Sequence, residues 1–433
     1  MADEVAEIVD LAHDGRGIAR LGGKAVFVAG ALPGEQVRVH RVRRRARHDE
    51  AVLVEVLTPS PQRVVPRCAH IGRCGGCALQ HLDPDAQVKA KERELLTQLE
   101  RIGRVRPERV LAPLRGPAYG YRRRARLGVK VLAKSGRAIV GFRERTSPLL
   151  TDVRCCPVLV APLGDLCEAL GELVGRLSIA SQVPQFEVSV GERATVLVAR
   201  VMVPPSAADL DQLRAFGRDH SVEFWLQPGA ADTAAPIDPP GAALEYWLPE
   251  FNVSLAFQPL DFIQINGELN RAMVSHALEL LAPEPTDEVL DLYCGLGNFT
   301  LPLARGARRV LGIEGDAGLI ERARANAARN GITNARFAVV NLALDSREAP
   351  WGGERVDRVL LDPPRAGAAE LLGHLARSAA RRVVYISCHP GTLARDAGIL
   401  VQQHGFALAA AGVMDMFPHT AHVESIAVFE RDR

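Results

Sequence analysis

The first 59 residues alternate apolar and polar positions in short runs. A period of two places successive side chains on opposite faces of a strand, and it occurs in AEIVDLA, AVFVAGA, EQVRVHRVRRR and DEAVLVEVL. The segments HDGRG, LGGK and LPGE separate these runs and carry the glycine and proline that turns need. Four or five such strands predict a small β-barrel of the OB type over residues 1–59, and the proline-rich TPSPQRVVPR predicts a linker after it.

Residues 60–255 mix helical and strand patterns, which predicts a central α+β domain. A helix is expected over PDAQVKAKERELLTQLERIG, with Asp83 or Asp85 near its start and Gly103 at its end. The runs RAIVGFRE, QFEVSV and ATVLVARVMV predict strands of an antiparallel sheet, whose order the sequence does not give.

Residues 256–433 alternate helix and strand regularly. The helix ELNRAMVSHALELL precedes the strand EVLDLYC, and the strands RVLGIE, ARFAVVN, RVLLD, RRVVYIS and SIAVFE follow. This order predicts an α/β fold, a doubly wound, mostly parallel sheet of the Rossmann-like kind. There is no apolar run of 18 residues and no basic start before an apolar stretch, so we expect a cytoplasmic protein with no membrane segment.

Charge is distributed unevenly, although the formal net charge is only +2. Residues 1–150 hold 29 Lys and Arg against 16 Asp and Glu, whereas the rest hold 24 against 35. This asymmetry favours a polyanionic partner for the front of the chain, with a solvated basic face as the alternative. Two clusters stand out, YGYRRRAR over 119–126 and the third predicted strand with Arg38, His40, Arg41, Arg43, Arg44, Arg45 and Arg47.

A candidate cofactor site follows the strand EVLDLYC, which leads directly into the loop GLGNFT at 295–300. In sheets of this kind ligands bind at the carboxyl ends of the strands, and glycine permits close approach of the backbone. The next strands end in Glu314, Asn341 and Asp362, which could contact ribose hydroxyls and an adenine edge. Together these features favour an adenosylmethionine site over a nicotinamide site.

A candidate nucleophile, Cys388, follows the strand RRVVYIS in the segment SCHPG. A lone cysteine is more often a small packing residue, but a thiol at a strand end beside a cofactor cleft is placed as a nucleophile would be. Glu424 in MFPHTAHVESI is the carboxylate expected to act as a base. His419 and His422 lack a third metal ligand, so we expect them to have a structural or hydrogen-bonding role.

Five segments resemble the RNA uracil-C5 methyltransferase family: QPLDFIQIN, DLYCGLGNFTLPLA, DPPRAG, SCHP and MFPHTAHVE. The front, with GRGIAR, VFV and ALPGEQV, resembles a TRAM domain, an RNA-binding module. The resemblance implies methylation of C5 of a uridine in 23S rRNA with S-adenosylmethionine, Cys388 being the nucleophile and Glu424 the base. It implies a cofactor pocket of Gln264, Tyr293, Asn298, Glu314, Asn341 and Asp362. One departure is visible, because the family usually has Asn where this chain has His389.

Four cysteines form a candidate metal site. Cys68, Cys74 and Cys77 lie in CAHIGRCGGC, and Cys155 and Cys156 precede a proline. Thiols in the cytoplasm stay reduced, and the spacing suits either zinc or a 4Fe-4S cluster. The family resemblance selects the 4Fe-4S cluster, with Cys156 as its fourth ligand and Cys155 as a bystander. Cys167 and Cys294 are expected to be packing residues.

Other functions are compatible with parts of this pattern. A tRNA uracil-C5 methyltransferase, or an enzyme for another 23S rRNA site, would use the same chemistry; the TRAM-like front and the four cysteines argue against the tRNA enzyme, which typically lacks both. A non-catalytic RNA-binding protein of ribosome assembly would need neither Cys388 nor Glu424. The sequence indicates no obligate protein partner.

Overall fold

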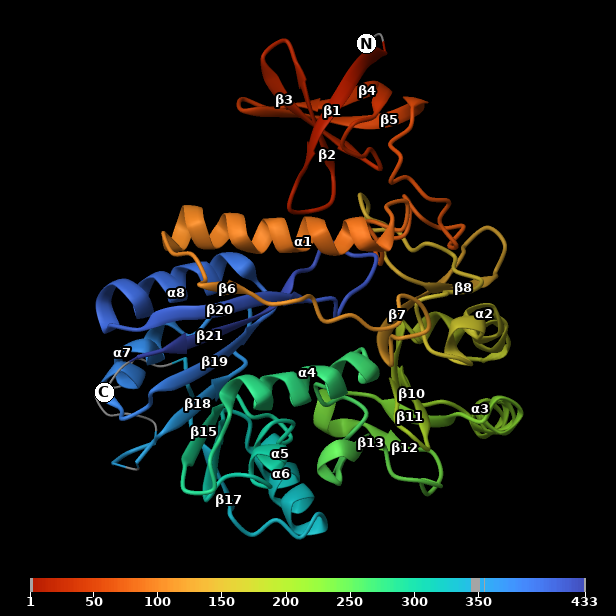
Figure 1. The fold of residues 1–433 in the computed structure, drawn as a ribbon. Helices are drawn as coiled ribbons and strands as arrows, with labels where there is room; N and C mark the ends of the chain where they lie inside the picture. The colour runs from red at the N-terminus through yellow and green to blue at the C-terminus, as the bar shows by residue number, and fades with distance from the viewer. Residues whose placement is uncertain (1–2, 344–350, 354, 432–433) are drawn as a thin grey trace.

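The chain is described by a computed structural model over residues 3–343, 351–353 and 355–431. A small barrel lies at one end of the molecule, and the two larger sheets of the remaining chain lie below it, with helix α1 between the barrel and the C-terminal sheet (Figure 1). No helix within these residues has the length and apolar character needed to span a bilayer.

The barrel is closed by five strands in the order β1-β2-β3-β5-β4. Their bounds are β1 Glu4–Leu11, β2 Gly17–Leu21, β3 Lys24–Ala29, β4 Gln36–Arg44 and β5 His48–Thr58. Inward-facing residues such as Ile8, Val26 and Val39 are fully buried in its core. The predicted OB-type barrel is confirmed.

The central sheet has six strands in the order β12-β11-β10-β9-β7-β8. The bounds are β7 Arg124–Val131, β8 Ala138–Gly141, β9 Gln185–Val190, β10 Thr195–Arg200, β11 Glu223–Gln227 and β12 Ala235–Pro236, with helices α2 Cys167–Arg176 and α3 Ala207–His220. The three predicted runs became β8, β9 and β10, whose pairings with each other and with β7 are antiparallel, whereas β11, which was not predicted, pairs in parallel with β10. The reason is that α3 connects them as a crossover, and such a connection returns the chain in the same direction. A hairpin of β13 Glu245–Leu248 and β14 Val253–Ala256 follows.

The C-terminal sheet has eight strands in the order β17-β16-β15-β18-β19-β21-β20-β6. The bounds are β15 Glu288–Leu292, β16 Arg309–Glu314, β17 Ala335–Val339, β18 Arg358–Leu361, β19 Arg382–Ser387, β20 Ala407–Met414 and β21 Glu424–Glu430, with helices α4 Gly267–Leu281, α5 Thr300–Leu303, α6 Ala317–Arg329, α7 Ala369–Arg377 and α8 Pro390–His404. Strands β15 to β19 are parallel, and β21 is antiparallel to both of its neighbours. The predicted doubly wound sheet is confirmed.

Helix α1, Pro84–Gln98, and strand β6, Arg109–Val110, attach the middle of the chain to this C-terminal sheet. Asp83 caps α1 by accepting from two backbone N–H groups, as its sequence position predicted. Leu95 is buried in the same core as Ala397 of α8, and β6 pairs with β20. The domain boundaries 1–59, 60–255 and 256–433 stay predictions, and residues 84–110 pack with the last part of the chain.

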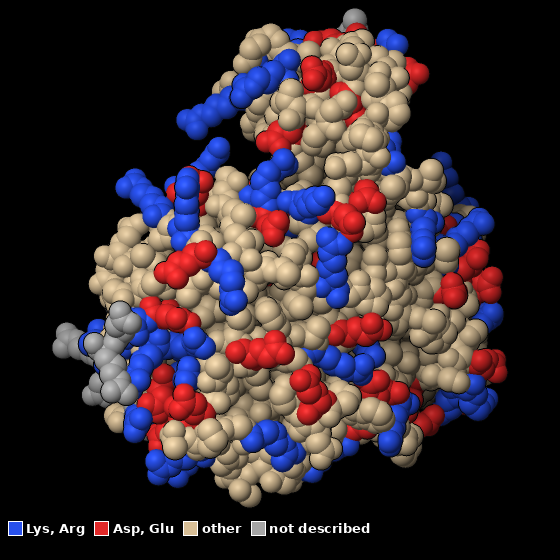
Figure 2. Space-filling model, in the orientation of Figure 1, with Lys and Arg blue, Asp and Glu red and all other residues tan. Residues whose placement is uncertain are grey.

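Basic residues gather on one face near the junction of the barrel and the body, whereas both signs mix lower down (Figure 2). At this junction a cavity of about 320 Å³ is lined by the barrel, by α1 and by the segment that precedes β21. Its basic and imidazole side chains are His13 from the barrel and Lys91, Arg93 and Arg101 from α1 and the turn after it. The fold therefore brings charged groups of distant segments into one hollow, where Asp10 and Glu94 accompany the cations and Asp10 pairs with Arg93 (3.0 Å).

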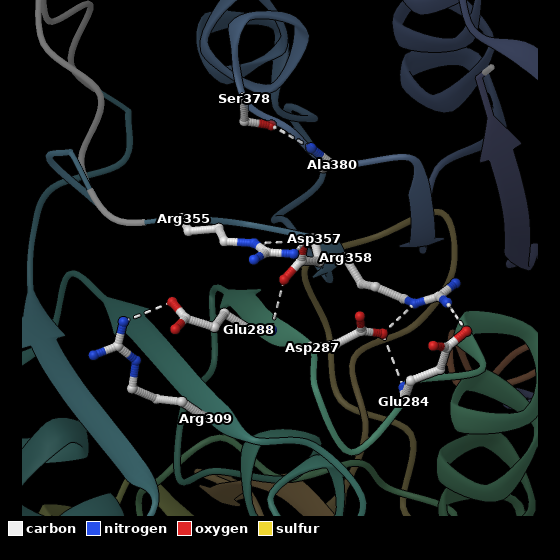
Figure 3. A network of polar contacts seen from close by, with 9 residues as sticks. All are labelled: Glu284, Asp287, Glu288, Arg309, Arg355, Asp357, Arg358, Ser378 and Ala380. Atoms are coloured by element: carbon white, nitrogen blue, oxygen red, sulfur yellow. Dashed lines mark hydrogen bonds and ion pairs between the residues drawn. The ribbon is translucent and has the colours of Figure 1, made fainter. Parts of the chain in front are cut away.

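A network of ion pairs and hydrogen bonds lies at the edge of the C-terminal sheet where its parallel strands begin (Figure 3). Arg358 at the start of β18 donates to Asp287 (2.7 Å) and to Glu284 (3.4 Å). Asp357 accepts from the backbone N–H of Glu288 (3.0 Å), which joins the starts of β18 and β15. Charges at this edge are thus paired with each other, and the carboxyl-terminal edge holds the candidate chemistry.

Candidate active site

The candidate site lies where the parallel strands of the C-terminal sheet end and β21 begins. Ser387, the last residue of β19, pairs with Ser425 of the antiparallel β21. Cys388 follows Ser387, and Glu424 precedes Ser425. Because the two strands are antiparallel, the next position of the register places the candidate nucleophile Cys388 beside the candidate base Glu424. Asp362 follows β18, the next strand of the sheet.

The thiol of Cys388 is half-buried among charged groups. Burial, together with the carboxylates of Glu424 and Asp362, raises its pKa to about 11, and Arg365 opposes this rise. The thiol is therefore protonated at neutral pH in the free protein. Arg365, at the end of the segment LLDPPR, was not among the predicted site residues, although it is the cation that favours the thiolate.

Glu424 is 3% exposed, and burial together with Asp362 raises its pKa well above the ordinary value. Burial likewise raises the pKa of Asp362 to about 7. A carboxylate whose pKa is raised binds a proton more strongly once it is ionised, which suits a general base. The site thus places one nucleophile beside two carboxyl groups of unusually high proton affinity.

His389, the departure from the family pattern, is the N-cap of α8. Its backbone is extended, and its Nδ1 accepts from the backbone N–H of Thr392 at 3.2 Å. Burial, Arg365 and His13 lower its pKa, so the ring stays neutral and keeps its acceptor. Asparagine is among the strongest N-caps, and the imidazole fills the same position. The substitution thus preserves the cap that fixes the backbone next to Cys388.

The loop after β15 turns through three left-handed residues, Tyr293 (φ 63°), Gly295 (φ 54°) and Gly297 (φ 92°). This conformation is strained at Tyr293, and strain of this kind is concentrated at functional sites. Glu314 accepts from the backbone N–H of Gly295 (3.3 Å) and of Gly315 (2.6 Å). Its carboxylate therefore fixes the glycine loop from the end of the neighbouring strand.

The other predicted cofactor residues lie around this loop in different settings. The amide of Asn298 exchanges two hydrogen bonds of 3.0 Å with Asn270 of α4 and accepts a third from Tyr246. Gln264 is half-buried, and Asn341 is exposed two residues beyond the end of β17, with its Oδ1 accepting from the backbone N–H of Ala343 (3.0 Å). Asn298 thus braces the loop against α4, and a cofactor contact of any of these six residues stays a prediction.

Asp291, on β15 just before the glycine loop, was missed by the sequence reasoning. It is fully buried, its Oδ2 accepts from the Thr300 hydroxyl (2.5 Å), and its Oδ1 has no hydrogen-bond partner among the residues that the structure describes. Burial, helped by the charges of Asp362 and Glu314, raises its pKa to about 7, although the hydrogen bond from Thr300 lowers it. An acid within an otherwise apolar strand was the signal that could have found it.

Asp291→Asn should stabilise the cofactor-free protein at pH 8 but little near pH 4. The folded state raises the carboxyl pKa from 3.8 to about 7, so the wild type loses stability as pH rises through that interval. Asparagine does not titrate and can still accept from Thr300. At about 1.4 kcal/mol per pH unit the gain approaches about 4 kcal/mol above pH 7. Denaturant unfolding at several pH values measures it, and a gain that does not change with pH would contradict the assignment.

The basic run 119–126 does not present a row of free cations. Arg123 pairs with Glu192 (2.9 Å) and Arg126 with Glu187 (2.5 Å), whereas Arg124 donates to the carbonyl of Leu260 (2.8 Å). Tyr121 is buried at 3% exposure. These contacts tie arginines of the run to the central part of the chain, and a role of the run in RNA contact stays a prediction.

The basic strand β4 is only partly neutralised. Arg41 binds Asp49 and Glu4, each at 2.8 Å, and Arg38 pairs with the exposed Glu55 at 3.3 Å. Arg44 and Arg47 are exposed and have no ion pair with any residue that the structure describes. The tip of this strand thus keeps a positive charge that a polyanion could use.

The four predicted metal ligands come together. Cys68, Cys74, Cys77 and Cys156 line one cavity of about 80 Å³, whose other walls include Phe142. Cys155 is exposed and outside this cavity, and Cys167 and Cys294 are buried in apolar cores. Within the described ranges, no three His, Cys, Asp or Glu side chains are arranged to hold a metal ion. We call the four-cysteine cavity the cage.

Comparison with known proteins places the chain in a family. A model described as tRNA (Uracil-5-)-methyltransferase matches residues 252–348 and 352–432, and the TRAM domain of tRNA (uracil(54)-C(5))-methyltransferase matches residues 5–62. A 23S rRNA (uracil(1939)-C(5))-methyltransferase RlmD from Stenotrophomonas maltophilia is 52% identical over 98% of this chain and 96% of its own length. The chain belongs to the RNA uracil-C5 methyltransferase family.

Further similarities agree with this RNA uracil-C5 methyltransferase assignment. The RlmD of Alkalilimnicola ehrlichii is 53% identical, again over 98% of this chain and 96% of its own. The crystal structure of Pyrococcus abyssi tRNA (uracil-54, C5)-methyltransferase in complex with S-adenosyl-L-homocysteine has a TM-score of 0.76 at 25% identity, covering 98% of this chain and 99% of that one. The predicted family and fold are confirmed, and S-adenosylmethionine as the methyl donor of this enzyme is supported.

Proposed function

We propose that this enzyme methylates C5 of one uridine in 23S rRNA, with Cys388 as nucleophile and Glu424 as base. The observation that carries the mechanism is the pairing of Ser387 with Ser425, which fixes the two groups beside each other at the carboxyl edge of the sheet. The glycine loop and Glu314 lie at the same edge, where a sheet of this kind binds its ligand.

The chemistry follows from the reluctance of C5 of uracil to attack a methyl group. The Cys388 thiolate adds to C6, and the electrons of the C5–C6 double bond move into the ring as an enolate. Bound S-adenosylmethionine would supply the methyl group to C5, its S–CH3 bond breaking to leave S-adenosylhomocysteine. Glu424 then removes the C5 proton, the double bond re-forms and the bond between C6 and Sγ breaks, which releases the thiolate.

The rRNA substrate is supported by relatives of about half identity along the whole chain, whose names give 23S rRNA. Arg44 and Arg47 are exposed on the barrel and have no ion pair with any residue that the structure describes, so they suit contact with a phosphate backbone. We expected the TRAM-like front to argue against a tRNA substrate. This expectation is wrong, because the TRAM model that matches residues 5–62 is that of a tRNA enzyme. A 23S rRNA substrate also fits the cytoplasmic location expected from the sequence.

The test is incubation of the protein with labelled methyl donor and either unmodified 23S rRNA or unmodified tRNA. We expect 5-methyluridine at a single position of the rRNA and none in the tRNA. Product in tRNA alone would move the assignment to the tRNA enzyme, and product in neither RNA would favour a non-catalytic role in ribosome assembly.

We also propose that the cage holds a 4Fe-4S cluster. The lining fits, because four half-buried thiols face one largely apolar cavity. Burial raises the pKa of Cys74 and Cys156 and raises that of Cys77 to about 12, so these groups need a strong local cation to ionise. In a cluster each thiolate binds a different iron, so the sulfurs need not converge on one ion. Methyl transfer consumes no electron, so the reaction does not need a redox group. A bound cluster would instead act as a rigid cross-link between the segments that bear the four cysteines.

The anaerobically purified protein should be brown and contain about four iron atoms per chain. Cys77→Ser should lose the iron and the colour, whereas Cys155→Ser, at the exposed neighbour of Cys156, should keep both. Iron analysis and the visible spectrum measure this. A colourless wild type that carries one zinc would decide for the zinc alternative.

A further inference from the structure

The segment Asp415–Val423 delivers the candidate base to the site. It connects β20 to β21, and its ends are closed by the pairing of Met414 with Glu424. The side chain of Lys91, on α1 and 3% exposed, donates to the Asp415 carboxylate (2.6 Å) and to the carbonyl of Phe417 (2.9 Å). The start of this base loop is therefore fixed to α1.

Several contacts of the base loop, Asp415–Val423, are made by His419. It is 2% exposed and adopts a left-handed backbone (φ 66°) that a non-glycine residue holds only when its surroundings enforce it. Its carbonyl accepts from the backbone N–H groups of Ala78 (2.8 Å) and Leu79 (2.9 Å). Gln87 of α1 accepts from its N–H (2.9 Å) and contacts its Nδ1 (3.2 Å).

Two of the contacts of His419 lead directly to the cage. Ala78 follows Cys77 in the chain, so the backbone that bears this cysteine also bonds the His419 carbonyl. The ring of Tyr119 packs on the His419 imidazole, with the ring centroids 4.3 Å apart. The guanidinium of Arg67 stacks on the same Tyr119 ring, 4.3 Å from its centroid. Arg67 immediately precedes Cys68.

The fourth cysteine reaches the same loop by a third route. Pro157, next to Cys156, accepts from the backbone N–H of Gly120 (2.9 Å), and Val158 accepts from that of Tyr121 (3.1 Å). The Tyr121 hydroxyl then donates to the carbonyl of Pro418 (3.0 Å). Three segments of the cage therefore converge on two adjacent residues of the base loop.

We propose that His419 is a positioning residue through which the cage, with its cluster bound, holds Glu424 in place. The cage would thereby support the last step, in which the C5 proton is removed and the bond between C6 and Sγ breaks. This inference rests on the proposed function, in which Glu424 removes the C5 proton. Addition of Cys388 and methyl transfer do not need that base, whereas release of the enzyme does. Disturbing His419 should therefore leave the methylated RNA covalently attached to Cys388.

The test uses His419→Gly in the full-length protein, with ordinary, unfluorinated substrate RNA. Glycine adopts the left-handed backbone freely, so this variant removes the ring contacts with Gln87 and Tyr119 and leaves the turn intact. We expect turnover to fall roughly 10- to 100-fold, within the range of a lost proton transfer. Denaturing gels should show a protein–RNA adduct that the wild type does not accumulate, and KM for RNA should stay within about threefold of the wild-type value.

Further variants separate the roles of ring and cage. His419→Asn also tolerates left-handed backbone and keeps a polar group for Gln87, so it should form less adduct than His419→Gly. Cys77→Ser should accumulate the same adduct as iron is lost. Cys155→Ser and His404→Gln, a histidine at the far end of α8, should resemble the wild type.

Three results would overturn one of the two proposals. A wild type that makes no 5-methyluridine would overturn the proposed function itself. A productive wild type, with His419→Gly and Cys77→Ser losing product without accumulating adduct, would overturn the link between cage and base. Normal turnover in both variants would overturn it as well.

Discussion

Cys388→Ala should lower methylation by at least about 10⁴-fold, the scale on which removal of a covalent nucleophile acts. Without the thiolate, C5 of uracil stays too weak a nucleophile to take the methyl group. Labelled methyl transfer measures the loss. RNA containing 5-fluorouridine provides a second readout, because fluorine at C5 prevents the final elimination and traps the wild-type enzyme covalently.

The control for this experiment is Cys155→Ala, which removes an exposed thiol outside both the cage and the candidate site. It should methylate RNA and form the fluorouridine adduct as the wild type does. An adduct that persists in Cys388→Ala would show that another residue attacks C6.

Glu424→Gln should reduce turnover by about 10² to 10⁴-fold and should accumulate a covalent adduct with ordinary RNA. The amide fits the same buried space but cannot accept the C5 proton. Because the Glu424 charge raises the pKa of Cys388, its removal should also shift the pH dependence of adduct formation to lower pH. Single-turnover gels across a pH series measure both effects.

Glu430→Gln is the matched control, at the opposite end of the same strand, where the carboxylate pairs with Arg382. It should leave turnover and the pH dependence of addition unchanged. A Glu424→Gln protein with full turnover would assign proton removal to another base, and Asp362 would then be the next carboxyl to test.

The barrel and the doubly wound sheet could be predicted because their signals are local. Alternation with a period of two marks each barrel strand, and the ends of the parallel strands place Glu314, Asp362 and Cys388 at one edge without any knowledge of side-chain contacts. The proximity of Cys388 and Glu424 needed one more fact, the position of β21 beside β19, which the sequence did not give.

Features that depend on distant partners could not be predicted. Strand β20 consists largely of small residues without alternation, and β6 is recognisable only once β20 is beside it. The charges of Arg123 and Arg126 looked available until Glu192 and Glu187 were seen to pair with them. The same holds for pKa values, since burial is decided by the whole fold.

The attachment of α1 and β6 to the last strands has a consequence for synthesis on the ribosome. The barrel has all five strands within its first 58 residues and is complete early. Helix α1 and β6 emerge next, but their partners α8 and β20 are translated only near the end of the chain. During that interval Leu95 and its apolar neighbours lack a cover, and this is when the nascent chain is most exposed to aggregation or to chaperone binding.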